Sequence, residues 1–94
     1  MKVVNVNGER MIAMSYEDAA LMHYATCALV YSRIEDETEA REELSTMKLD
    51  PDVISSDIEE KCREIYYFEC KLNEARKLRD GLQDALDAFV GGAA

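Results

Sequence analysis

Apolar residues in the second half of the chain recur at alternating spacings of three and four. Read as heptads, residues 50–90 place nine apolar side chains on one seam: Ile54, Ile58, Ile65, Phe68, Leu72, Ala75, Leu82, Leu86 and Phe89. Only Lys61 and Arg79 interrupt it, and their aliphatic stems can lie along apolar surface while the charge stays in water. This pattern is typical of a helix packed lengthwise against another helix. It predicts a helix over residues 51–90, about 60 Å long at about 1.5 Å per residue.

The preceding stretch, residues 16–47, predicts the helix that packs against this seam. Ser15 followed three residues later by Asp18 is a capping-box pattern, in which each side chain can bond the backbone N–H of the other residue. Residues 19–31 are apolar nearly all the way round the helix. We therefore expect burial on two or more sides, by the N-terminal hairpin, the second helix and a second copy of the chain.

The boundaries of the second helix follow from local signals. Asp50 suits an N-cap and Pro51 the first helical position, which places the turn between the helices near residues 48–51. Ser56 with Glu59 forms a second capping-box pattern, so a short turn over residues 51–55 could precede the long helix. The Gly91-Gly92 pair predicts the end of the helix.

Residues 1–14 predict a β-hairpin. Asn7-Gly8 is the strongest short hairpin turn signal, because both positions tolerate the positive φ of a type I′ turn. A two-residue loop pairs Val6 with Glu9, Val4 with Met11 and Val3 with Ile12. A lone hairpin is marginal in water. We expect it to dock on the helices as a ribbon that caps them, or else to join another sheet edge.

The predicted fold is mainly α, with an N-terminal β-hairpin followed by a long antiparallel helical hairpin (ββαα) in one domain over residues 1–94. At 94 residues the chain is near the lower end for a self-sufficient core, so we expect a homodimer or higher oligomer of coiled-coil type. No signal-peptide pattern and no long apolar run are present. Three cysteines without a Cys-x-x-Cys spacing suit reduced thiols. We therefore expect a cytoplasmic protein with no membrane contact.

Charge is unevenly distributed along the chain. The formal net charge is −9, which argues against direct binding of nucleic acid. Residues 35–64 carry twelve acidic and four basic residues, a balance of −8, whereas residues 1–34 balance to zero and residues 65–94 to −1. A helical hairpin brings both parts of the acidic segment to its turn end. We expect this acidic tip to bind a basic protein surface through Glu35, Asp36, Glu39, Glu42, Glu43, Asp57 and Glu60. The alternative is a solvated face that only keeps the protein soluble.

Two further groups of residues are candidates for binding. Tyrosine is common at interfaces because its body is apolar and its tip polar. The predicted oligomer interface comprises Leu21, Tyr24, Ala28, Tyr31, Tyr66 and Tyr67, with packing inside the chain's own core as the alternative.

His23, Cys27 and Cys70 form a weak candidate for a zinc site, since a turn near residue 49 sets residue 27 level with residue 70. The site lacks a fourth ligand, and small buried thiols with a core histidine are the alternative.

Catalytic chemistry has little support in the sequence. His23 and Cys27 lack an oxyanion-hole loop, the carboxylates lie on a solvated helix, and no glycine-rich phosphate loop occurs, so we expect neither an enzyme nor a cofactor. We expect an inhibitor that presents an acidic, nucleic-acid-mimicking surface, by analogy of size and charge alone with small acidic anti-defence proteins such as anti-CRISPRs. The alternative is a homo-oligomeric scaffold, or an oligomer that sequesters a small ligand at a subunit interface.

Overall fold

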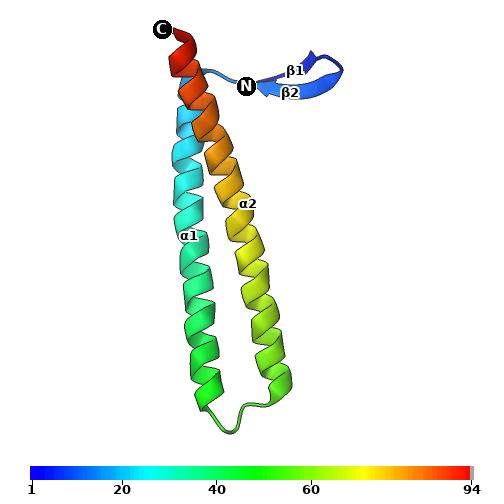
Figure 1. Ribbon diagram of the computed structural model, residues 1–94, viewed down its shortest axis with the longest axis vertical. Coiled ribbons are helices and arrows are strands. Elements are labelled where there is room, and N and C mark those ends of the chain that lie inside the picture. Colours follow the sequence, from blue (N-terminus) through cyan, green and yellow to red (C-terminus); the bar gives the residue numbers. More distant parts are fainter. Residues whose placement is uncertain (94) are drawn as a thin grey trace.

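The protein is a rod made of two long antiparallel helices with a small β-hairpin at one end (Figure 1). The computed structural model describes residues 1–93, and side chains as far as Phe89. The elements are β1 (Lys2–Val6), β2 (Glu9–Ala13), α1 (Tyr16–Leu49) and α2 (Ser55–Ala93). The rod measures 62 × 28 × 17 Å. Its radius of gyration is 19.4 Å, against about 13 Å for a compact domain of this size. The predicted ββαα order and the rod shape are confirmed.

Local signals set the start and end of α1. Ser15 is the N-cap, and its Oγ accepts a hydrogen bond from the backbone N–H of Asp18 at 3.1 Å, as predicted. The helix runs two residues beyond the predicted end and stops at Leu49. The N–H of Asp50 donates to the carbonyl of Met47 at 3.2 Å. Asp50 therefore caps the C-terminus of α1, and its predicted role as the N-cap of the second helix is wrong.

The second helix begins later than Pro51. Residues 51–54 form a turn. In it, the Asp50 carboxylate accepts a hydrogen bond from the backbone N–H of Asp52 at 2.9 Å, which is an Asx turn. The carbonyl of Ile54 accepts from Asp57 and Ile58 at the start of α2. The expected short turn before the long helix is thus present, but Ser56 lies inside the first helical turn instead of capping it.

The Gly91-Gly92 pair does not end α2, which continues to Ala93. The predicted stop is therefore wrong. Glycine in a helix costs about 1 kcal/mol relative to alanine and permits the left-handed conformation of a C-cap, but it does not impose that conformation.

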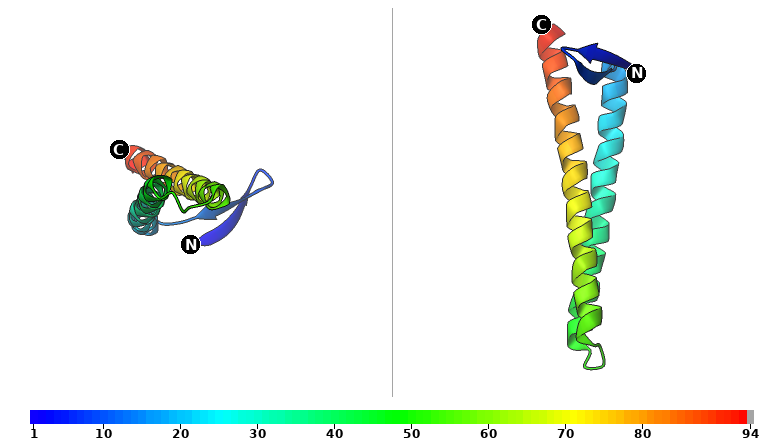
Figure 2. Two further views of the ribbon diagram at one scale, coloured as in Figure 1. Left: turned by 90° about the horizontal axis from the view of Figure 1, so that it is seen from below. Right: turned by 90° about the vertical axis from the view of Figure 1, so that its right-hand side faces the viewer.

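The β-hairpin has the predicted register but not the predicted docking. Val6 pairs with Glu9, Val4 with Met11 and Val3 with Ile12. Asn7 and Gly8 have φ values of 52° and 84°, as a type I′ turn requires. The hairpin extends sideways from the open end of the helical hairpin, and apart from half-buried Val4 its strand residues are exposed (Figures 1 and 2). The expected capping of the helices is wrong, because the apolar side chains are divided between both faces of the ribbon and neither face offers a continuous docking surface.

The core is a single seam between the helices. Its buried members are Ala19, Thr26, Val30 and Ala40 from α1, and Ile65, Leu72, Ala75, Leu82 and Leu86 from α2. Val30 packs with Leu72 and Ala75 near the middle of the rod. Thr26 is satisfied because its hydroxyl donates to the carbonyl of Met22 at 2.5 Å.

The predicted seam of α2 is confirmed in its central part and fails at its ends. Ile58 and Phe68 are half-buried, and the interrupting Lys61 and Arg79 lie half-buried along the seam as expected. The terminal members Ile54 and Phe89 are exposed.

Neither α1 nor α2, over the residues described, contains a stretch apolar enough to cross a membrane.

Candidate partner-binding surfaces

The outer face of α1, turned away from α2, changes from apolar to acidic along the rod. Successive residues of a helix are about 100° apart, so positions spaced three and four residues apart share a face. The buried residues of α1 define the face toward α2. On the opposite side lie two consecutive groups: the apolar stripe of Leu21, Tyr24, Ala28 and Tyr31, and the acidic row of Glu35, Glu39 and Glu42. All seven residues are exposed.

The negative charge of the acidic row is not compensated by ion pairs. Among the side chains that the structure describes, none of Glu35, Glu39 and Glu42 forms an ion pair, and the same holds for Asp57 and Glu60 of α2. The other two predicted tip residues are paired. Asp36 lies 3.9 Å from Arg33, and Glu43 lies 2.5 Å from Lys61.

The acidic residues do not form a tip. Glu35 lies near the middle of α1, so the row covers the whole turn-proximal half of that helix. Asp57 and Glu60 belong to the first turns of α2, beside the loop. The surface is therefore an acidic half-rod, which we define as residues 35–64.

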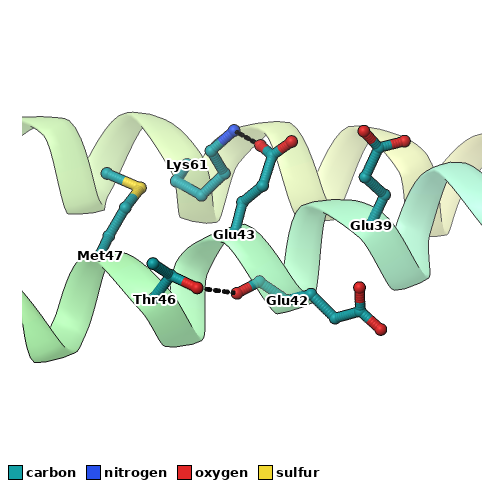
Figure 3. Close-up of a pocket in the computed structure, with 6 residues that line it drawn as sticks. All are labelled: Glu39, Glu42, Glu43, Thr46, Met47 and Lys61. Carbon is teal, nitrogen blue, oxygen red and sulfur yellow. Dashed lines mark hydrogen bonds and ion pairs between the residues drawn. The ribbon is translucent and has the colours of Figure 1, made fainter.

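A shallow hollow of about 510 Å³ lies within the acidic half-rod. It is lined by Glu39, Glu42, Glu43, Thr46 and Met47 of α1 and by Lys61 of α2 (Figure 3). The Lys61 ammonium bridges Glu43 at 2.5 Å and Glu64 at 3.1 Å. In Figure 3 the Glu43 carboxylate points toward Lys61, whereas that of Glu42 points away from it. The hollow therefore has one neutralised carboxylate beside two free ones.

Two basic side chains tie the helices together in this half. Hydrogen bonds to Glu43 and then Glu64 raise the pKa of the Lys61 ammonium. Arg41 bonds Glu37 at 3.0 Å on its own helix and also pairs with Glu69 of α2. The bond to Glu37, with the nearby charges of both carboxylates, raises the pKa of Arg41. Both cations are thus engaged by acids, and they leave the acidic row of α1 uncompensated.

The predicted oligomer interface divides into two separate surfaces. Leu21, Tyr24 and Tyr31 are 69%, 76% and 72% exposed on the outer face of α1. Within one chain the side of residues 19–31 that faces α2 is buried and the hairpin does not cover another side, while the expected burial by a second copy stays a prediction. Tyr66 and Tyr67 are exposed on α2, on sides that face away from α1.

The two tyrosines of α2 have their own contacts. Tyr67 packs edge-on against Phe68 at 5.8 Å between ring centroids, and the Lys71 ammonium lies 5.5 Å from its ring. Interaction with the Cys70 thiol, one helical turn away, raises the pKa of Tyr66. Local contacts thus occupy both side chains, and neither is continuous with the apolar stripe of α1.

The residues of the zinc hypothesis are not assembled into a site. Cys27 Sγ lies 3.9 Å from His23 Nδ1, one turn apart on α1. Val30 packs with Leu72 and Ala75, so Cys27 lies level with residues beyond Ala75 and not with Cys70. The predicted level was wrong because the turn lies at residues 51–54. Within the described part of the chain, no three His, Cys, Asp or Glu side chains are grouped to hold a metal.

An apolar hollow that sequence reasoning missed lies at the root of the β-hairpin. It measures about 330 Å³ and is lined by Ile12, Ala13, Met14, Ala19, Leu82, Ala85, Leu86 and Phe89. The ring of Phe89, one of its lining residues, also contacts the ring of Tyr16, with centroids 5.5 Å apart. The sequence feature that could have predicted this hollow is the pair of alanines at positions 19 and 85, because their small side chains leave space between larger ones.

Comparisons with protein-family models, with curated proteins and with solved structures found no match to this chain.

Proposed function

We propose that the acidic half-rod binds a basic surface of a partner protein and inhibits that partner by occupying a site for nucleic acid. The supporting observation is the row of Glu35, Glu39 and Glu42, exposed and without ion pairs among the described side chains. The helix fixes the spacing of these three carboxylates along one face, so a partner meets a preformed line of charge and the backbone needs no ordering when it binds.

The charge density of this region is close to that of a nucleic acid strand. The acidic half-rod carries a net charge of −8. From Glu35 to the end of α1 at Leu49 it spans about 21 Å at about 1.5 Å per residue, which gives roughly one net charge per 3 Å. A nucleic acid strand carries about one phosphate per 3.4 Å. A basic groove that accepts a strand therefore meets a similar potential on this surface.

The test compares two triple variants with the same net charge. The first is Glu35→Gln, Glu39→Gln and Glu42→Gln, and the second is Asp80→Asn, Asp84→Asn and Asp87→Asn near the other end of the rod. Each protein is immobilised and exposed to cell extract at low salt, and bound proteins are eluted with double-stranded DNA. We expect a DNA-eluted protein on the wild type and on the Asp variant, but not on the Glu variant.

The captured protein is then tested for DNA binding by fluorescence anisotropy of a labelled duplex. Free wild-type protein should block that binding, and the Glu variant should block it at least tenfold less well. Equal capture by the two triple variants would show that only bulk charge matters, and would contradict the proposal. Capture without any effect on DNA binding would contradict nucleic-acid mimicry.

A second candidate function is a homo-oligomeric scaffold, or an oligomer that holds a small ligand between subunits. The observation in its favour is the exposed apolar stripe of α1. The two candidates differ in their response to charge: the Glu variant should lose function under the first and retain it under the second.

A further inference from the structure

We propose that two copies of the chain pair antiparallel through the outer faces of their α1 helices. The apolar stripe of Leu21, Tyr24, Ala28 and Tyr31 covers the same stripe of the second copy, and the two acidic half-rods point to opposite ends. This inference does not rest on the proposed function, because the acidic half-rods beyond Glu35 stay exposed whether or not they bind a partner.

The single chain leaves much apolar surface uncovered. None of the described large side chains is fully buried in the two-helix core. The two tyrosines and the leucine of the stripe, about seven-tenths exposed, present on the order of 400 Å². The largest apolar patch on a typical monomer is about 300–600 Å² and is often functional, so the stripe is of the size at which such patches serve binding. A helix on the stripe also covers exposed Ala25 and Ser32 beside it, which brings the buried area toward about 600 Å² per partner, the lower limit for specific interfaces.

The spacing of the stripe selects a helix as the occupant. Its members follow one another at three, four and three residues, which is the spacing of a coiled-coil seam. A compact or irregular partner would not need such a line.

A second copy of this same stripe fits it by size. In an antiparallel pair centred near Thr26, Tyr24 faces Ala28 of the partner subunit and Leu21 faces Tyr31 of the partner subunit. Each aromatic ring thus meets a smaller side chain, and the twofold axis repeats both contacts. The result is a row of four helices, with the two α1 helices in the middle and one α2 on each outer side, over the hairpin-proximal part of each rod.

Charge selects the antiparallel direction. A parallel pair would set two segments of net charge −8 side by side along their whole length. In an antiparallel pair, each acidic half-rod extends beyond the hairpin end of the other copy. The two half-rods are then separated by much more than the screening length of about 8 Å at physiological salt. One kind of like-charge contact remains, between Glu35 and Glu17 of the partner subunit. The twofold axis repeats it at both edges of the interface.

The first test measures molecular mass by light scattering coupled to size exclusion. Tyr24→Glu and Tyr66→Glu form a matched pair, because both residues are well exposed, at 76% and 68%. We expect the wild type and Tyr66→Glu to have the mass of two chains, and Tyr24→Glu that of one. Far-ultraviolet circular dichroism checks that each variant keeps its helices. A single-chain mass for the wild type, or dissociation by Tyr66→Glu alone, would overturn the proposal.

The second test measures direction by pulsed electron spin resonance. A spin label is attached to Ser45→Cys in a background with Cys27, Cys62 and Cys70 replaced by alanine, which must retain the mass and helicity of the wild type. In the antiparallel dimer the two labels lie about 57 Å apart at about 1.5 Å of rise per residue. In a parallel dimer they lie within about 20 Å, because packed helix axes are about 8–10 Å apart. A short distance would therefore overturn the antiparallel arrangement.

Discussion

Lys61 Nζ lies 2.5 Å from Glu43 Oε2, and this ion pair joins α2 to α1 at a seam position where an apolar residue would be expected. The Lys61 side chain is only 16% exposed, whereas that of Glu43 is 48% exposed. The lysine stem thus fills the seam, and its charge reaches the edge, where the carboxylate meets it. One residue serves both the packing of the helices and their electrostatic connection.

Replacing Lys61 by methionine should raise the midpoint of thermal unfolding by about 2–5 °C for a chain of this length. The apolar side chain fills the same seam position, and the carboxylates it releases are exposed and can be solvated by water. Thermal unfolding followed by circular dichroism measures the change. Arg63→Met is the control, because it removes the same charge from an exposed position outside the seam. An equal rise in both variants would attribute the effect to charge and not to packing.

Alkaline pH should destabilise the fold. The pKa of Lys61 is raised above its ordinary value of 10.5, and that of Tyr66 above 10.0. A raised pKa means that the folded state holds the proton more tightly, so this stabilisation is complete below the unfolded pKa and is lost as pH rises through the folded one. Urea unfolding should therefore give a free energy of unfolding that is flat from pH 8 to about 9.5 and falls above about 10.

The variants Lys61→Met and Tyr66→Phe separate the two contributions. Each should reduce the slope of stability against pH above pH 10, and the double variant should reduce it further. A slope that neither variant changes would assign alkaline unfolding to other groups.

Local interactions explain which parts of the fold the sequence predicts correctly. The turn at Asn7-Gly8 sets the register of the hairpin, and Ser15 with Asp18 starts α1, because each signal acts within four residues. The failures involve competition between alternatives of similar energy. Asp50 can cap a helix that follows it or one that precedes it, and the local sequence does not decide between them. The docking of the hairpin depends on which side chains the helices leave uncovered.

The candidate surface divides in the same way. The acidic row of Glu35, Glu39 and Glu42 follows from helical spacing alone, so the sequence could identify it. The pairing of Glu43 with Lys61 required the length of the turn, because the turn sets which levels of α1 and α2 face each other. The turn at residues 51–54, in place of 48–51, also explains why Cys27 and Cys70 were wrongly placed at one level.

Val30→Ala should destabilise the helical hairpin by about 1–3 kcal/mol. Val30 is 3% exposed and packs with Leu72 and Ala75, so truncation leaves a cavity in the core. Urea unfolding measures the loss. Leu49→Ala removes a larger side chain that is 86% exposed and should cost under about 0.5 kcal/mol. Equal costs would contradict the position of the core.

Gly8→Val should disrupt the β-hairpin and leave the helices intact. Gly8 has a φ of 84°, which a β-branched residue adopts only under strain. Cross-strand nuclear Overhauser effects between Val4 and Met11 should disappear, while the thermal midpoint of helical unfolding should change by less than about 2 °C, because the strand pair does not pack on the helices. A large loss of helical stability would show that the hairpin docks on the rod after all.

Glu35→Lys should tighten the antiparallel dimer. Its ammonium group would face Glu17 of the partner subunit, so a repulsive contact becomes attractive at both symmetry-related edges. Exposed ion pairs are weak individually, and two of them should lower the dissociation constant by about threefold to thirtyfold. Sedimentation equilibrium measures that constant. Glu42→Lys is the control, because it changes the net charge equally but lies on the same face beyond the end of the partner's α1. Equal tightening by the two variants would mean that overall charge, and not the contact between Glu35 and Glu17, limits association.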